Sequence, residues 1–410
     1  MPAIAALFGP GPDPRAAARL DGAARAMDRL GRGTVLRVDA ANGGARAVCR
    51  QGRLPGADVW ADEASGLVVA MDGECYGPAP GAGAHARKVL GGAPLARGAA
   101  AVGELYRELG PGFAAEMEGA FAVVVLDRKA NEVHAFTDRF GLRPLAYRVQ
   151  EGAIFLASTL AAFTRAWPER GHGIDWTALA DWLSFEHILG EKTLLDGVRL
   201  LPNAGRLRFK AGDRAADVGE YWSLASSEPR HDLPFDQAVT GAGELFARAV
   251  ERLCADGARA GVYMTSGLDS RAIGGFLARV QPGFPSFTYG LQGCRDMVWG
   301  EELARMLGSA HHPFPMDDSS WLFDMAGTFV GRTESFVNIL HSHGVHTYEA
   351  ASGHMDVHLS GYGGGSFYGG DTTNTAMLAA RTPAQACEML YKGYVNSLGN
   401  VLRSPMERFH

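Results

Sequence analysis

Residues 265–270 have the types and spacing best suited to chemistry in this chain, and they read Thr-Ser-Gly-Leu-Asp-Ser. They follow an apolar stretch, residues 261–264, that predicts a buried strand, and they precede a predicted helix over 271–280. Small residues let backbone N–H groups approach phosphate oxygens, and a helix N-terminus adds a favourable dipole. Asp269 would repel bare phosphate, so it indicates a Mg²⁺ ion bridging to pyrophosphate. A plain strand–turn–helix with Ser270 as N-cap explains the same run equally well.

The segments around this loop alternate between strand and helix patterns from residue 236 onwards. We predict helices over 238–254, 271–280, 300–307 and 383–391, and strands over 261–264, 284–289 and 355–359. The first of these helices is expected to bury Leu245, Phe246, Val250 and Leu253 on one face. Alternation of this kind predicts a parallel, doubly wound sheet.

The N-terminal part has a different sequence pattern, with short apolar runs separated by turn residues. Strands are predicted over 3–8, 67–71, 120–126, 132–137 and 153–157, and a helix over 102–109. The polar run Asp-Arg-Lys-Ala-Asn at 127–131 predicts a hairpin turn. Further on, the sequence predicts an amphipathic helix over 176–188, a turn and strand within 200–209, and a boundary after Trp222.

Composition limits the classes of protein that this chain can represent. It has 410 residues, 47% apolar and 20% charged, with a net charge of -6 and no lysine or arginine run, so we expect no nucleic-acid partner. Its five cysteines are widely spaced and form no CxxC pair, which argues against a disulfide framework or zinc site. The N-terminus lacks a signal-peptide pattern, and no apolar run is long enough for a bilayer. The expected location is the cytoplasm, without a membrane partner.

The loop at 265–270 resembles the pyrophosphate loop of the ATP-pyrophosphatase superfamily, usually written SGGxDS, in its asparagine-synthetase form. Walker A is excluded because its Gly-Lys-Ser/Thr is absent. Phe-Thr-Tyr-Gly at 287–290 ends the next strand, where the family recognises adenine, and residues 359–370 resemble the family segment LSGEGADELFGG. The resemblance implies ATP and Mg²⁺ as cofactors. It implies nucleotide-binding roles for Thr265, Ser266, Gly267, Leu268, Asp269, Ser270, Thr288, Tyr289, Gly290, Gly361 and Gly363.

The second loop departs from the family pattern. Tyr362 stands in place of the family's Glu, and Gly365-Ser366 stands in place of its Asp-Glu pair. The β-lactam synthetases also resemble this chain and carry Tyr at this position, where a Glu-supported Tyr removes a proton from the attacking nitrogen. The pKa of Tyr is ordinarily about 10, so that role requires a lowered pKa or a concerted proton transfer. Glu388 is a candidate partner of Tyr362. The alternatives are that Tyr362 is only an aromatic residue packing in the loop and that Glu388 is only a surface charge.

Loss of the acidic pair also leaves Asp269 short of fellow magnesium ligands. Asp371 is close in sequence and is the candidate second ligand. The family continues well past this loop and supplies a Lys that stabilises charge on phosphorus. Lys392 is the only lysine after Tyr362, and its spacing is too short for that role, so relative to the family the chain ends early.

The N-terminal part resembles the class II glutamine amidotransferase domain, an N-terminal-nucleophile fold. Residues 118–122, Glu-Gly-Ala-Phe-Ala, and 138–145, Asp-Arg-Phe-Gly-Leu-Arg-Pro-Leu, carry this resemblance. In that family a Cys follows the initiator Met and attacks glutamine. Here Pro2 replaces the Cys, Asp72 replaces a glutamine-contacting Asn, and Gly98 replaces the Asp that holds the glutamine ammonium. The resemblance therefore implies that glutamine hydrolysis is absent.

These observations predict an α/β chain with an N-terminal nucleophile-type αββα sandwich followed by a doubly wound, parallel-sheet ATP-pyrophosphatase domain that ends early. The expected parts are a glutamine amidotransferase-like domain at 1–165, a connecting region at 166–232 and an asparagine synthetase-like domain at 233–410. The expected function is adenylation of a small-molecule or peptide carboxylate and amide formation with an amine. This expected function includes ring closure within one molecule, because the Cys-lacking β-lactam synthetases and lasso-peptide cyclases resemble this chain. The alternatives are an ammonia-dependent asparagine synthetase and a non-catalytic accessory protein; a homodimer is a further expectation.

Overall fold

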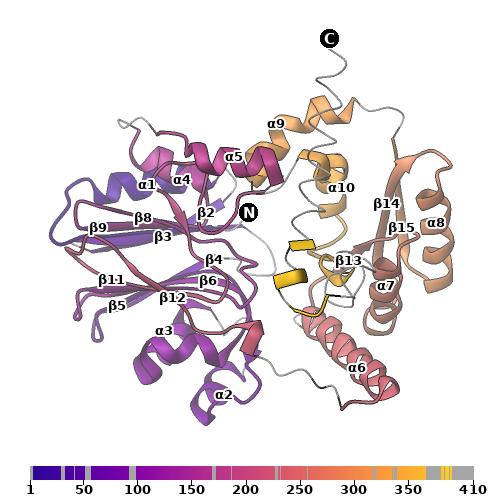
Figure 1. Ribbon diagram of the computed structural model, residues 1–410, viewed down its shortest axis with the longest axis horizontal. Coiled ribbons are helices and arrows are strands. Elements are labelled where there is room, and N and C mark those ends of the chain that lie inside the picture. Colours follow the sequence, from indigo (N-terminus) through magenta and orange to yellow (C-terminus); the bar gives the residue numbers. More distant parts are fainter. Residues whose placement is uncertain are drawn as a thin grey trace. The chain divides into compact units, whose positions relative to one another are not determined.

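The chain divides into two compact units. A computed structural model gives their structure (Figure 1). The first unit comprises Met1–Ala260 with Met316–Val357, and the second comprises Gly261–Pro315 with His358–His410. The structure describes residues 3–28, 33–40, 42–50, 57–91, 98–168, 172–185, 187–226, 230, 232–255, 257–316, 320–334, 336, 339–365, 380–382, 384–386 and 388–389.

The first unit contains two six-stranded sheets stacked face to face. Their orders are β10-β8-β9-β1-β3-β2 and β12-β11-β7-β6-β5-β4, and the strand pairs within them are antiparallel. The strands are β1 (Ala3–Phe8), β2 (Gly33–Ala40), β3 (Gly43–Arg50), β4 (Ala57–Asp62), β5 (Leu67–Pro78), β6 (Met117–Asp127), β7 (Glu132–Thr137), β8 (Ala146–Gln150), β9 (Ala153–Ala157), β10 (Arg199–Leu200), β11 (Gly205–Lys210) and β12 (Asp217–Glu220).

Helices cover the outer face of each sheet, which makes an αββα sandwich (Figure 1). One apolar cluster lies between the sheets, and one lies under the helices on either side. Residues 120–126 of strand β6 are therefore buried on both faces, which explains why this stretch is continuously apolar rather than alternating. The helices of this unit are α1 (Ala16–Met27), α2 (Ala84–Leu90), α3 (Ala99–Leu109), α4 (Leu160–Ala166), α5 (Trp176–Phe185), α6 (Phe235–Cys254), α9 (Trp321–Thr333) and α10 (Tyr348–Ser352), with short 3₁₀ segments at Gly110–Glu116, Leu224–Ser226 and Ile339–Thr347.

The local predictions for this unit are largely confirmed. Strands β1, β7 and β9 have the predicted bounds. The turn at 127–131 joins β6 to β7, and the Asp127 carboxylate accepts hydrogen bonds from the amides of Lys129 and Ala130 at 3.1 and 2.9 Å. Three strands from the expected connecting region, β10 to β12, complete the two sheets. The predicted apolar face of α6 is wrong at Leu245, which is 61% exposed, whereas Val250 is buried.

The second unit contains a four-stranded sheet in the order β15-β14-β13-β16. Its elements are β13 (Ala260–Tyr263), α7 (Leu268–Val280), β14 (Pro285–Leu291), α8 (Arg295–Leu307), β15 (Ala310–Met316) and β16 (Val357–Leu359). Strands β13 and β14 are parallel, with Val262 paired to Ser286. The chain moves outward from β13 to β15 and then returns to the other side of β13. Such a reversal is the switch point at which open α/β sheets bind ligands.

Two helices of this unit begin earlier than the sequence predicted. Helix α7 begins at Leu268 with Gly267 as its N-cap, so Ser270 lies in the first turn and the prediction of Ser270 as N-cap is wrong. Helix α8 begins at Arg295 rather than at Gly300. Acidic and hydroxylated residues in a first turn resemble loop residues in sequence, which explains the late predicted starts.

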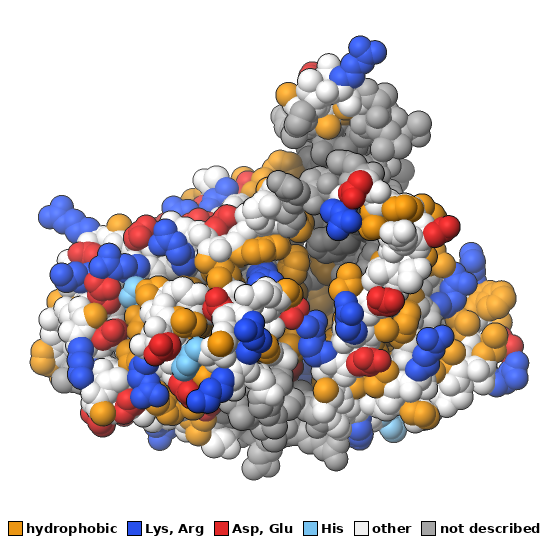
Figure 2. All heavy atoms as spheres, turned by 90° about the horizontal axis from the view of Figure 1, so that it is seen from below, with side chains coloured by type: hydrophobic (Ala, Val, Ile, Leu, Met, Phe, Trp, Pro, Cys, Tyr) orange, Lys and Arg blue, Asp and Glu red, His pale blue; other side chains and the backbone are white. Residues whose placement is uncertain are grey.

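Among the described helices, none is long and apolar enough to cross a membrane. On the face that Figure 2 shows, basic and acidic side chains are interspersed with apolar ones among the described residues.

The connection between β15 and β16 packs on the sandwich through its own side chains. Glu334 ends α9 with a left-handed backbone (φ 51°). Its carboxylate accepts hydrogen bonds from the amides of Leu160 and, at 3.0 Å, Ala161 in the first turn of α4. Phe336 packs against the apolar cluster under α1 and α4. The segment that leads into β16 is therefore attached to the N-terminal sandwich.

We expect Glu334→Ala to lower the free energy of unfolding by about 1–2 kcal/mol, the usual effect of removing a side chain that caps a helix. Urea unfolding followed by tryptophan fluorescence measures the loss. Glu251→Ala, at an exposed position of α6, is the matched control and is expected to change stability by less than about 0.5 kcal/mol. Equal effects of the two substitutions would show that the cap contributes nothing.

Candidate functional site

The loop at 265–270 leaves β13 at the switch point and is anchored to β14. The amide of Met264 donates to the carbonyl of Phe287 at 2.7 Å, and the Thr288 hydroxyl donates to the carbonyl of Met264 at 2.6 Å. Thr288 is buried and its hydroxyl is already used, so the structure gives it a supporting position in the candidate site. Gly300 of α8 lets that helix approach, because a Cβ there would lie 2.2 Å from the Thr288 hydroxyl oxygen.

Three amides of the loop have acceptors within the protein. The Thr265 amide donates to the Ser270 hydroxyl at 3.1 Å, and the Gly267 amide donates to the Thr265 hydroxyl at 3.1 Å. The Ser266 amide and hydroxyl both donate to Asp296, at 3.0 and 2.7 Å. Asp296 lies in the first turn of α8, and sequence reasoning did not single out its side chain. The sequence signal available for Asp296 was its position just after β14.

The amides of the first turn of α7 are the available donors. Leu268, Asp269 and Ser270 occupy this turn, and no side chain of the described residues caps it. The amides that begin a helix lack partners within that helix and point outward along its axis. Leu268 is 76% exposed and the backbone of Gly267 is exposed, so the turn is open to solvent. This geometry suits an anion such as phosphate.

The glycine-rich loop after β16 meets the first loop at Asp269. A Cβ on Gly361 would lie 2.3 Å from the Cβ of Asp269, and a Cβ on Gly364 would lie 3.2 Å from its Oδ1. The Gly364 amide donates to the Gly361 carbonyl at 2.9 Å, and Gly363 has a φ of 82°. Glycine is needed here because any side chain would displace Asp269. The two loops predicted to bind nucleotide therefore converge on one carboxylate.

The residues around Asp269 fit a magnesium ion that is held mainly by phosphate. Within the described ranges, no group of three or more His, Cys, Asp or Glu side chains could hold a metal ion by itself. Mg²⁺ at nucleotide sites commonly uses one or two carboxylates together with substrate phosphates and water. Asp269 can supply one such carboxylate beside the uncapped turn of α7. Asp371, Ser366 and Lys392 lie outside the described residues.

Tyr289 and Gly290 lie near the end of β14, as predicted. The Tyr289 ring meets the Tyr263 ring edge-on, with centroids 5.6 Å apart. A Cβ on Gly290 would lie 2.8 Å from the Sγ of Cys294, so glycine permits a close approach there. These residues border the same strand ends as the phosphate loop.

Tyr362 lies in the glycine-rich loop with its side chain 96% exposed. Its amide donates to the Ser360 hydroxyl at 3.2 Å. Glu388 is also exposed. A proton acceptor works best where water is largely excluded, so this exposure gives no support to a catalytic role for Tyr362. The pairing of Tyr362 with Glu388 stays a prediction.

The position expected to contact glutamine holds a buried carboxylate. Asp72 on β5 is 3% exposed, and its Oδ1 has no hydrogen-bond partner among the described residues. Burial raises the pKa of Asp72 to about 6, although Arg143 and a hydrogen bond from Ser158 act in the opposite direction. The Ser158 hydroxyl also accepts from the Ile4 amide at 2.9 Å, which places this group at the start of β1.

Gly98, the position of another expected loss, is the N-cap of α3. The Asp58 carboxylate accepts a hydrogen bond from the Ala99 amide at 3.1 Å, and it would lie 2.7 Å from a Cβ on residue 98. Asp58 therefore occupies the space into which a longer side chain at this position would extend.

Two segments of the chain match known protein families. Residues 99–222 match the family described as glutamine amidotransferase domain, and residues 241–409 match the family described as asparagine synthase. Together the two segments span more than half of the chain.

Individual proteins are also similar to this chain over part of their length. Asparagine synthetase (glutamine-hydrolyzing) 2 of Bacillus subtilis (strain 168) is 25% identical over 333 residues, 75% of this chain and 42% of that protein. Asparagine synthetase (glutamine-hydrolyzing) 3 of the same organism is 26% identical over 214 residues, 48% of this chain and 34% of that protein. The amidase chyE of Penicillium rubens is 25% identical over 178 residues, 42% of this chain and 25% of that protein. The chain thus spans less than half the length of these relatives.

Among solved structures, the glutamine phosphoribosylpyrophosphate amidotransferase from Bacillus subtilis, complexed with ADP and GMP, is similar to this chain at 12% identity with a TM-score of 0.36. The similarity covers 76% of this chain and 80% of that one. The two matched segments and the curated relatives make this chain similar to the asparagine synthetase family over most of its length.

Proposed function

We propose that this chain is part of an ATP-dependent carbon–nitrogen ligase that adenylates a carboxylate and joins it to an amine. The convergence of the two loops at Asp269, beside the uncapped first turn of α7, is the observation that carries this proposal. The match of residues 241–409 to the asparagine synthase family supports it. The carboxylate would belong to a small molecule or to a peptide.

The chemistry proceeds in two displacements. A carboxylate oxygen of the substrate attacks the α-phosphorus of ATP, and pyrophosphate leaves with the electrons of the broken P–O bond. The amine nitrogen then attacks the acyl carbon, AMP leaves, and the nitrogen loses a proton to a base. Mg²⁺ would neutralise charge on the phosphates.

The residues of this chain would bind and orient the nucleotide. The amides of Leu268, Asp269 and Ser270 would donate to phosphate oxygens, and the Asp269 carboxylate would hold Mg²⁺. The backbone of Gly361 keeps Asp269 in position. Ser266 and Asp296 hold the loop in its present shape through two hydrogen bonds.

We further propose that the chain works without glutamine hydrolysis. Attack on glutamine develops negative charge on the amide oxygen, which donors such as an Asn side chain stabilise. At pH values above its pKa the Asp72 carboxylate is an acceptor only and would repel that charge. Pro2 offers no thiol for the attack. The amine would then come from free ammonia or from the substrate itself, which includes intramolecular ring closure.

A second candidate is a nucleotide-binding accessory protein. The exposed side chain of Tyr362 favours it, together with the internal partners of the Thr265, Ser266 and Gly267 amides. Such a protein would bind ATP with Mg²⁺ and would not release pyrophosphate.

ATP–pyrophosphate exchange with a panel of carboxylates tests the ligase proposal. We expect carboxylate-dependent exchange that Asp269→Asn lowers by about 100-fold or more, because a positioned charge at the phosphates is lost. Asp324→Asn, at an exposed acidic position in the first turn of α9, is the matched control and should leave exchange unchanged. Binding of ATP without exchange would favour the accessory protein, and neither binding nor exchange would reject both candidates. Aspartate with ammonium as the sole productive pair would identify an ammonia-dependent asparagine synthetase.

A further inference from the structure

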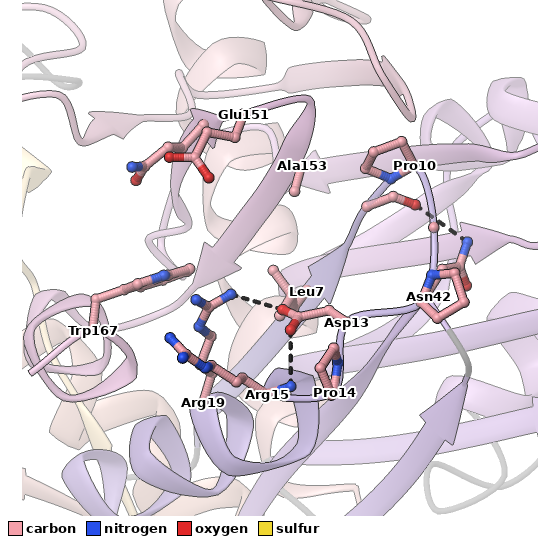
Figure 3. Close-up of a pocket in the computed structure, with 14 residues that line it drawn as sticks. Leu7, Pro10, Asp13, Pro14, Arg15, Arg19, Asn42, Glu151, Ala153 and Trp167 are labelled. Atoms are coloured by element: carbon pink, nitrogen blue, oxygen red, sulfur yellow. Dashed lines mark hydrogen bonds and ion pairs between the residues drawn. The ribbon is translucent and has the colours of Figure 1, made fainter. Parts of the chain in front are cut away.

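A cavity of about 480 Å³ lies at one end of the sandwich, away from every residue assigned above (Figure 3). The end of β1, the first turns of α1 and the β8–β9 hairpin form its walls. All of its lining residues belong to the first unit, and neither Asp72 nor Ser158 is among them. Its volume is that of a small-molecule site.

One wall carries two arginines, Arg15 at the N-cap of α1 and Arg19 about one turn further along the helix. The Arg19 Nη1 donates to Asp13 Oδ2 at 2.7 Å. The Arg19 guanidinium also lies over the Trp167 ring, 5.2 Å from its centroid, and Trp167 is 8% exposed. These contacts hold the guanidinium in one orientation. Its Nε is buried without an acceptor among the described residues, so the protein itself does not satisfy every donor of this group.

Arg15 adds a second positive charge to the same wall. It is exposed, and within the described part of the chain no acidic side chain pairs with its guanidinium. Figure 3 shows the Arg15 side chain running from the start of α1 toward Arg19. The first turn of α1 contains no acid, but the Asp13 Oδ1 accepts a hydrogen bond from the Arg15 amide at 2.8 Å, so Asp13 also offsets the helix dipole at this end. Asp13 balances only one of these charges.

The opposite wall carries a carboxylate. Glu151 lies in the turn of the β8–β9 hairpin with a left-handed backbone (φ 52°), and its side chain is exposed. Figure 3 shows it projecting toward the side of the cavity where Trp167 and Arg19 lie. Positive and negative groups thus face each other across the cavity, a layout that matches a ligand with both charges.

We propose that this cavity binds a small amino acid, or another zwitterion of that size. The ligand carboxylate would lie on the Arg15 and Arg19 guanidinium groups, whose planar donors suit carboxylate oxygens. The ligand ammonium group would lie toward Glu151. A polyanion such as a nucleotide fits poorly, because Asp13 and Glu151 place two carboxylates in the same cavity. This site is independent of the ligase activity proposed above.

Isothermal titration calorimetry of the full chain with the common amino acids tests this proposal. We expect at least one to bind with a dissociation constant below about 10 mM. Its deaminated acid and its decarboxylated amine should bind at least about tenfold more weakly, because each lacks one charge. Arg15→Ala should weaken binding by about tenfold or more. Arg25→Ala, at an exposed position of the same helix that does not line the cavity, is the control and should have no effect.

Glu151→Gln separates a zwitterion site from a simple anion site. It should weaken binding of the amino acid and leave binding of the deaminated acid unchanged. Thermal melts of each variant without ligand verify that the fold is intact. The proposal is overturned if no amino acid binds, or if Arg15→Ala and Arg25→Ala behave alike. It is also overturned if inorganic phosphate binds as well as the amino acid and Glu151→Gln has no effect.

Discussion

Gly361→Ala is expected to lower carboxylate-dependent ATP–pyrophosphate exchange by about 100-fold, the effect of misplacing a reacting group by about 1 Å. The new Cβ would lie 2.3 Å from the Cβ of Asp269, so either the glycine-rich loop or the start of α7 must move. Movement of Asp269 would carry the proposed magnesium ligand away from the first-turn amides. Exchange rates at saturating ATP, with a calorimetric titration of ATP and Mg²⁺, measure the change.

The matched control for this substitution is Gly275→Ala on α7. A Cβ there meets no described atom within 4 Å, and alanine favours helix, so we expect normal exchange and a stability equal to or up to about 1 kcal/mol above the wild type. If Gly361→Ala retained full exchange, the convergence of the two loops at Asp269 would have no functional meaning. The proposed function would then lose its main structural support.

Asp72→Asn is expected to raise the free energy of unfolding by about 3 kcal/mol at pH 8, the equivalent of a rise of about two pKa units. The pKa of Asp72 is raised from 3.8 in the unfolded chain to about 6 in the folded protein, because the carboxylate is buried. The folded wild type therefore binds more protons between these values, and its stability falls as the pH rises through them. Asparagine carries no charge and avoids this cost.

The pH dependence distinguishes this cause from a general effect of the substitution. The stability difference between Asp72→Asn and the wild type should be near zero below about pH 4, grow up to about pH 6, and stay constant above that. Urea unfolding at a series of pH values measures it, with Asp324→Asn as the exposed control. A variant less stable than the wild type at pH 8 would show that the ionised carboxylate is well paired, although no described residue donates to its Oδ1.

Local sequence signals were sufficient for several elements of this fold, whereas others, including α1, β2 to β4, β8 and β15, were not predicted. Strands β1, β7 and β9 were predicted with their observed bounds, because apolar runs and turn residues are read over a few neighbouring positions. The turn at 127–131 and the phosphate loop at 265–270 were predicted for the same reason. Errors fell at helix starts and at Leu245, whose exposure depends on what the rest of the molecule places beside α6.

The candidate site was only partly predictable. Residue types placed the two loops after strands, and the switch in strand order put both strands side by side. Sequence reasoning missed Asp296, which binds Ser266 across 30 residues, and Glu334, which binds Ala161 across 173 residues. Neither contact follows from a local pattern, since each depends on where distant backbone segments pass.

By itself, the sequence determined the strand-rich character of the N-terminal part, the strand–helix alternation after residue 236 and the two loops rich in small residues, because these depend on neighbours along the chain. Only the tertiary structure decided that both loops meet at Asp269, that strands β10 to β12 complete the sandwich, and that Asp72 is buried with an oxygen to which no described residue donates. These outcomes depend on long-range packing, in which the partner of a side chain is set by the path of segments far away in the sequence.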